Sequence, residues 1–146
     1  MINFKEIAIG CDHAGFALKE RIKKYLNENK VEINDLGTFS EDSTDYAEYA
    51  HKVANCVNEE QEIVGILICG SGNGISMAAN KHSGIRAALC WDTEIAKLAR
   101  QHNNANIISL PARFVSEEKA VEIVKTFLNE EFEGGRHQRR VLKIDK

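Results

Sequence analysis

Several features that mark specialised classes of protein are scarce or absent in this sequence. No apolar run approaches the length of a bilayer, and the N-terminal residues carry charge early and lack the apolar core of a signal peptide. Basic residues are not in excess: the 146-residue chain has a net charge of -3, which argues against a dedicated nucleic-acid-binding protein. We therefore expect a cytoplasmic protein that binds neither membranes nor nucleic acids.

Proline is almost absent, and the sequence has no closely spaced pairs of cysteines or histidines that would bind a metal. The only proline is Pro111, and no linker, repeat or low-complexity segment interrupts the chain, so residues 1–146 are predicted to form one domain. The histidines show no paired ligand spacing, and no metal site is predicted. No C-x-x-C motif occurs, so we expect reduced thiols at the four cysteines: Cys11, Cys56, Cys69 and Cys90.

What the sequence does contain is a regular alternation of short apolar runs and helical patterns. Strands are predicted at residues 7–10, 31–36, 63–68, 86–90 and 106–110, with helices between them. This alternation is typical of βα units around a parallel sheet. We therefore predict an α/β fold with a five-stranded parallel sheet and helices on both faces. The run Ile63 to Ile68, broken only by Gly65, predicts a central strand covered on both sides.

Apolar residues at helical spacing locate several of the helices. One helix is predicted to begin near Asp12 or His13, another covers residues 47–57, and a third opens at Ser116. The basic segment after Gly134-Gly135 is predicted to form a solvated C-terminal helix.

The segment richest in chemistry follows the central strand. There Cys69 precedes the glycine-rich loop 70–74, and a helical pattern follows at 75–81. Backbone N–H groups at such a helix start can hold an anion or a developing oxyanion. The same positive end would lower the pKa of the Cys69 thiol from its usual value of about 8.5. The alternative is a tight turn beside a buried, inert cysteine, and spacing alone leaves both interpretations open.

Polar residues flank other strands as well. They are Cys11, Asp12 and His13 after the first strand, Asp92 after the fourth, His102, Asn103 and Asn104 before the fifth, and Arg113 after it. Because open parallel sheets bind ligands at the carboxyl ends of their strands, we expect these groups to converge on one sheet edge.

Known phosphate chemistries can be tested against the loop. It lacks the Gly-Lys-Ser/Thr of a nucleotide-triphosphate site, a C-x5-R phosphatase would need arginine in place of Ile75, and a receiver domain would need aspartate in place of Cys69. A dinucleotide site would use Asp35 on the ribose, but Asp12 and His13 would crowd the pyrophosphate. What remains is acid–base or nucleophilic chemistry on a small anionic substrate.

Six groups of residues, spread over essentially the whole chain, carry a family resemblance. They are Gly10 to Gly15, Asp35 to Thr38, Asp45-Tyr46, Cys69 to Lys81, His102-Asn103 with Asn106, and Gly134 to His137 with Arg140-Val141. Together they resemble the ribose-5-phosphate isomerase B family, within a wider group of sugar-phosphate isomerases that includes the galactose-6-phosphate isomerase subunits.

The resemblance implies a Rossmann-like, doubly wound fold and the interconversion of ribose 5-phosphate with ribulose 5-phosphate in the pentose phosphate pathway. It also implies a homodimer with active sites across the subunit interface. The segment from about residue 133 is implied to contribute to the active site and to the dimer contact. No metal or cofactor is implied. Pairing of dimers into tetramers stays open.

The resemblance also assigns roles. Cys69 is implied as the base, with the Ser71 hydroxyl and the backbone of Gly70, Gly72, Asn73 and Gly74 around the enediolate. His102 is implied to open the furanose ring beside Asn103, and Asp12 and Tyr46 to contact the sugar. The implied phosphate ligands are His13, Arg113, Arg136, His137 and Arg140.

Departures from the family pattern leave this set intact. Ser71 stands where members often have threonine, Ala47 where they have proline, and Pro111 near a usual glycine, which could shift Arg113 slightly. Relatives without the cysteine carry glutamate at the position of Ile75, so the thiolate mechanism is the consistent choice here.

Two other functions remain open. One is the same isomerisation on allose 6-phosphate, galactose 6-phosphate or a tetrulose phosphate, because pocket length cannot be read from one sequence. The other is a silent sugar-phosphate-binding subunit, against which the intact set of Cys69, His102 and Arg113 argues.

Overall fold

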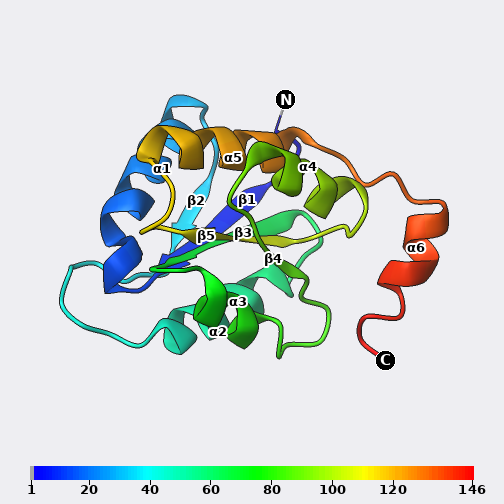
Figure 1. Ribbon diagram of the computed structural model, residues 1–146, viewed down its shortest axis with the longest axis horizontal. Coiled ribbons are helices and arrows are strands. Elements are labelled where there is room, and N and C mark those ends of the chain that lie inside the picture. The colour runs from blue at the N-terminus through cyan, green and yellow to red at the C-terminus, as the bar shows by residue number, and fades with distance from the viewer. Residues whose placement is uncertain (1) are drawn as a thin grey trace.

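Five parallel strands form one sheet in the order β2-β1-β3-β5-β4 (Figure 1). The computed structural model describes residues 2–146. The strands are β1 (Glu6–Cys11), β2 (Ile33–Asp35), β3 (Ile63–Cys69), β4 (Ala87–Leu89) and β5 (Ile107–Pro111). All five lie within or close to the predicted ranges, and the prediction of a parallel α/β sheet is confirmed.

Strand β3 occupies the centre of the sheet. It pairs with β1 on one side and β5 on the other, and all seven of its residues are buried. Gly65 is the small residue this position needs, since a Cβ there would lie 2.8 Å from Val53 and 2.9 Å from Ile107. The sequence-based expectation of a strand covered on both faces is confirmed.

Helices cover both faces of the sheet (Figure 1). On one face lie α1 (Phe16–Glu28), α4 (Thr93–Gln101) and α5 (Glu117–Asn129), and on the other lie α2 (Tyr46–Val57) and α3 (Asn73–Ala79). Each layer has its own apolar core. Among the described residues 2–146, no helix is both long enough and apolar enough to span a membrane.

Capping residues explain where the helices begin. Ser116 Oγ accepts a hydrogen bond from Lys119 N (3.1 Å), so α5 starts where the sequence predicts. The first helical segment begins as a 3-10 turn, η1 (His13–Gly15), whose amides bond to the Asp12 carboxylate before α1 continues. Helix α3 starts at Asn73, two residues earlier than predicted.

The C-terminal segment extends away from the sheet. The short helix α6 (Arg136–Val141) lies at the far right of Figure 1, beyond the ends at which the strands begin. Its connection to α5 is fastened to the end of α4, where Glu133 N donates to Gln101 O (3.0 Å) and Gln101 Nε2 to Glu130 (2.8 Å). Within α6 only His137 is buried, in agreement with a solvated helix.

Candidate functional site

The order of the strands reverses between β1 and β3. From β1 the chain passes outward to β2, and then returns to β3 on the other side of β1. In open parallel sheets the crevice at such a reversal, outside the carboxyl ends of the strands, is where ligands bind. A pocket of about 520 Å³ lies there, lined by Asp12, Tyr46, Cys69, Gly70, Ser71, Gly74, Arg113 and Phe114.

Cys69 is the cysteine that lines this pocket. It is the last residue of β3, and 5% of its surface is exposed. Burial raises the pKa of the other thiols, to about 12 for Cys11, about 11 for Cys56 and about 12 for Cys90. All four cysteines are free. The thiols of Cys11, Cys56 and Cys90 are therefore protonated packing groups at neutral pH.

The loop after Cys69 depends on two of its glycines. Gly72 has a φ of 76°, and a Cβ there would lie 2.5 Å from Leu89. Ser109 Oγ anchors the turn from below by donating to Gly72 O (2.8 Å). A Cβ at Gly74 would lie 2.5 Å from the Tyr46 ring. The glycines thus let the loop pass close to its neighbours and start α3 beside the pocket.

The backbone at the start of α3 supplies hydrogen-bond donors. The first amides of an α-helix have no partner within the helix. One of them, Asn73 N, donates to Ser71 Oγ (3.3 Å), which holds the Ser71 side chain over the loop. The arrangement fits the predicted anion-holding loop.

Arg113 brings positive charge to the same loop. Ala112 N donates to Cys69 O (2.9 Å) and Arg113 N to Gly70 O (3.0 Å), so the segments after β3 and β5 continue the sheet pairing past Pro111. A Cβ at Gly70 would lie 3.0 Å from Arg113 Nη1. The guanidinium therefore rests against the glycine loop, and Pro111 does not displace it from the pocket lining.

The turn after β1 carries Asp12, which lines the pocket, and His13, which follows it in the chain. The Asp12 carboxylate accepts from Ala14 N (3.0 Å) and Gly15 N (3.3 Å), which fixes its position at the pocket wall. His13 Nδ1 accepts from Thr44 N (3.2 Å), in the segment that leads to α2. Tyr46, the first residue of α2, is 44% exposed and covers the pocket from that side.

The other residues predicted for the site lie at the opposite end of the sheet from the pocket. The expectation that all the polar groups converge on one sheet edge is therefore wrong for a single chain. Helix α4 carries the chain back to the beginning of β5, so His102 and Asn103 lie at the amino end of that strand. The five residues of β5 alone span ~16 Å. Arg136, His137 and Arg140 on α6 lie at this same far end (Figure 1).

At this far end two histidines form a compact cluster. The rings of His102 and His137 stack with centroids 4.1 Å apart and planes 11° apart. Glu133 Oε1 lies 3.8 Å from Nε2 of each ring. Burial lowers the pKa of His137, and the charges of His102 and Arg136 act in the same direction.

The sequence did not indicate Phe114, which lines the pocket, or Glu133, which lies beside the stacked histidines. Phe114 follows Arg113 and is 74% exposed at the pocket. Glu133 stands four residues before His137, and that spacing was the available signal.

The ligand atoms of His102, Glu133 and His137 lie within 4.8 Å of one another, a spacing at which three side chains can bind one metal ion. Because a bound ion lies in the plane of each imidazole, the stacked rings would have to tilt to share one.

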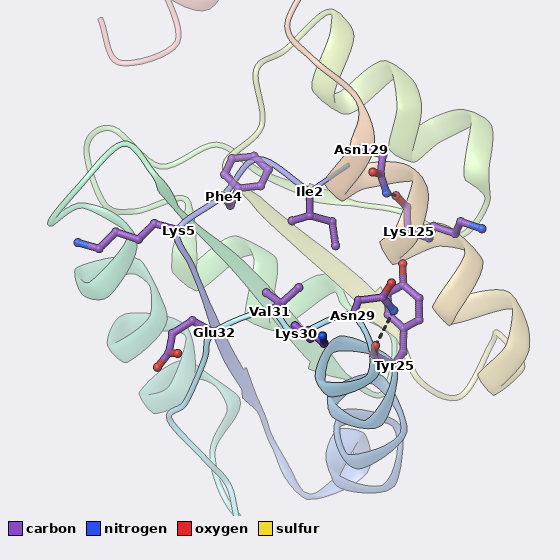
Figure 2. A pocket seen from close by; sticks show the side chains of 10 residues that line it. All are labelled: Ile2, Phe4, Lys5, Tyr25, Asn29, Lys30, Val31, Glu32, Lys125 and Asn129. Carbon is purple, nitrogen blue, oxygen red and sulfur yellow. Dashed lines mark hydrogen bonds between the residues drawn. The ribbon is translucent and has the colours of Figure 1, made fainter.

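A second hollow of similar size lies at the other end of the sheet. Figure 2 shows it between the ends of α1 and α5, lined by Ile2, Phe4, Lys5, Tyr25, Asn29, Lys30, Val31, Glu32, Lys125 and Asn129. None of the predicted site residues lies there. The amines of Lys5 and Lys125 point away from each other in that view, so these two charges do not converge on one point.

Asp35, the residue that a dinucleotide site would use, is already engaged. Its carboxylate accepts from the Lys19 amine (2.6 Å) and from the Lys23 amine (2.8 Å). Burial alone would raise the pKa of Asp35, but these two hydrogen bonds outweigh it and hold the pKa below its usual value. The dinucleotide alternative therefore loses its ribose ligand.

Comparison with known proteins places this arrangement in a family. Residues 7–144 match the family described as ribose/galactose isomerase. The chain is 50% identical over 140 residues to ribose-5-phosphate isomerase B of Escherichia coli, covering 96% of this chain and 94% of that protein.

Comparison with solved structures supports the same family assignment. A ribose 5-phosphate isomerase from Thermotoga maritima superposes with a TM-score of 0.94 at 53% identity, covering 96% of this chain and 97% of that one. Ribose-5-phosphate isomerase B from Mycoplasma genitalium, solved with bound ribulose-5-phosphate, gives 0.93 at 44% identity, covering 99% and 95%.

Proposed function

The chain belongs to the ribose/galactose isomerase family, and from that premise we propose that it interconverts ribose 5-phosphate and ribulose 5-phosphate, in the pentose phosphate pathway. One observation carries the assignment of chemistry: a cysteine lines the pocket at the switch point of the sheet, beside a helix start rich in backbone donors. An aldose–ketose isomerase needs a base next to a group that stabilises negative charge on oxygen.

The proposed reaction moves one proton between two carbons. The Cys69 thiolate takes the proton from C2 of the open-chain aldose, and the electrons of that bond form an enediolate. Backbone N–H groups of residues 70–74, with the Ser71 hydroxyl, hold the oxygen on which charge develops. The thiol then returns the proton to C1 while the hydroxyl proton on O2 passes to O1, which gives the ketose. Asp12 and Tyr46 contact the sugar from the pocket wall.

The complete site requires a second copy of the chain. His102 is the proposed acid–base group that opens the furanose ring, with Asn103 beside it, yet both lie at the far end of the sheet from Cys69. We infer a homodimer in which each pocket receives His102 and α6 from the partner copy. Two features support this: α6 is largely exposed, and so are Met77 (66%) and Leu142 (61%). Light scattering should give the mass of two chains.

The phosphate is the proposed ligand of the basic residues. In the dimer, Arg113 and His13 of one copy and Arg136, His137 and Arg140 of the other would surround it. Arginine pairs with phosphate oxygens through two parallel hydrogen bonds, which suits a doubly charged group. Phosphate binding would explain why an acidic chain carries a basic helix α6.

A panel of sugar phosphates tests the substrate. The purified chain is assayed with ribose 5-phosphate, allose 6-phosphate, galactose 6-phosphate and a tetrulose phosphate, and the highest kcat/KM is expected for ribose 5-phosphate. A clear preference for another sugar phosphate would show that the chain catalyses the same isomerisation on that substrate instead of ribose 5-phosphate. No turnover of any sugar, despite binding, would identify a silent subunit.

Two cysteine variants test the base. Cys69→Ala should bind ribose 5-phosphate but lose exchange of the C2 proton with solvent. Cys56→Ala is the matched control, because that thiol bonds to Glu6 away from the pocket and should leave turnover unchanged. Full turnover by Cys69→Ala would remove the thiol from the mechanism.

We also propose that the enzyme works in the cytoplasm. Its four free cysteines suit a reducing compartment. Fractionation of the source cells, followed by an isomerase assay on each fraction, would show where the activity resides.

A further inference from the structure

The segment between β2 and α2 makes one directed contact with the site. Thr44 N lies 3.2 Å from Nδ1 of His13, and the backbone amide is the donor. A backbone N–H cannot accept a hydrogen bond, so Nδ1 must offer its lone pair and carry no proton. The neutral ring then has its proton on Nε2.

Both ends of this segment are anchored, which fixes the direction of the Thr44 amide. At its start, Thr38 N donates to Cys11 O (2.8 Å), and the buried Lys19 amine donates to Thr38 O (2.7 Å). At its end, the Thr44 and Tyr49 hydroxyls share a hydrogen bond of 2.9 Å. The amide that faces His13 therefore belongs to a segment held on both sides.

We propose that the Thr44 backbone amide is a positioning group, which sets the tautomer of His13 so that its free Nε2–H serves as a neutral hydrogen-bond donor to the phosphate of the substrate. An imidazolium would carry a proton on Nδ1 and meet the Thr44 N–H head on. Among the phosphate ligands, the arginines thus supply the charge, and His13 supplies one oriented donor. This inference rests on the proposed function only for the identity of the ligand.

The tautomer can be observed directly. Protein labelled with nitrogen-15 in its histidines gives a long-range proton–nitrogen correlation spectrum, and the signal lost in His13→Gln identifies His13. Near neutral pH the ring of His13 is expected to carry its proton on Nε2 alone. A proton on Nδ1, or on both nitrogens, overturns the proposal. The spectrum needs no turnover, so it stands even if the chain proves inactive on every sugar phosphate.

A pair of variants tests the consequence for binding. The glutamine amide can reach the place of Nε2, whereas the shorter asparagine amide falls near Nδ1. His13→Gln should therefore keep KM for ribose 5-phosphate close to its normal value, while His13→Asn raises it about tenfold or more, the loss expected for a hydrogen bond to a charged group. Equal and large increases in both variants would show that the cation is needed, and would contradict the proposal.

The matched controls are His51→Gln and His51→Asn. His51 lies on α2 and pairs with His82 (2.7 Å), outside the pocket. Both controls should leave KM unchanged. A change in them would assign the effects at His13 to a general disturbance of the fold and overturn the assignment of a specific donor.

Discussion

Replacing Asp35 with asparagine should destabilise the fold by about 3 kcal/mol. The Lys19 side chain is fully buried, and its amine lies 2.6 and 2.8 Å from the two Asp35 oxygens. The Asp35→Asn amide would remove the negative charge nearest that ammonium and replace one acceptor oxygen with a donor, while the bond to Thr38 O stays. Removing one partner of a buried ion pair costs about 3–5 kcal/mol. Because 14% of the Asp35 side chain is exposed, we expect the lower end.

Urea unfolding at a fixed protein concentration measures this loss, since the stability of an oligomer depends on concentration. The matched control is Glu60→Gln, which breaks an exposed pair with Lys5 (3.0 Å) and should change the midpoint little. If Asp35→Asn shifted the midpoint no further than this control, the reasoning about the buried amine would be refuted.

The pH dependence of the effect has a definite sign. The folded pKa of Asp35 lies below the unfolded value of about 3.9, so its contribution is complete above that value and is lost as the pH falls through the lowered pKa. The difference in stability between Asp35→Asn and the unaltered chain should therefore shrink only in strongly acidic solution.

Three further predictions concern the site. Iodoacetamide near pH 8 should alkylate Cys69 first and abolish turnover, because burial keeps the other thiols protonated; peptide mass spectrometry showing another cysteine modified first would contradict this. Gly74→Ala should raise KM by pushing the Tyr46 ring out of the pocket, and Tyr46→Ala should cause no further loss in that background. Glu133→Gln should lower kcat by less than about fivefold by removing the carboxylate beside His102, with an unchanged rate as the opposing result.

The strands and helices could be predicted because local signals agree with the fold. The apolar run before Cys69 is a strand in the middle of the sheet, and Ser116 caps α5 with the hydrogen bond that its residue type suggests. The glycine loop could be placed at the carboxyl end of β3 for the same reason: glycine, strand and helix patterns follow one another without a gap.

Residues that depend on the path of the chain in space could not be placed from local patterns. His102 precedes a strand in the sequence, and only the return of α4 shows that it lies at the opposite end of the sheet from Cys69. No local sequence pattern marks Glu133, and only the structure shows that it lies beside the stacked rings of His102 and His137. The ion pairs of Asp35 likewise join segments far apart in sequence.

A mixed dimer of two inactive variants tests the shared site most directly. Cys69→Ala and His102→Asn are co-expressed with different tags, and the mixed dimer is purified through both. If each pocket combines Cys69 of one copy with His102 of the other, one of its two pockets is intact, and the mixed dimer should show about half the activity of the unaltered dimer. A mixed dimer as inactive as its parents would contradict the account.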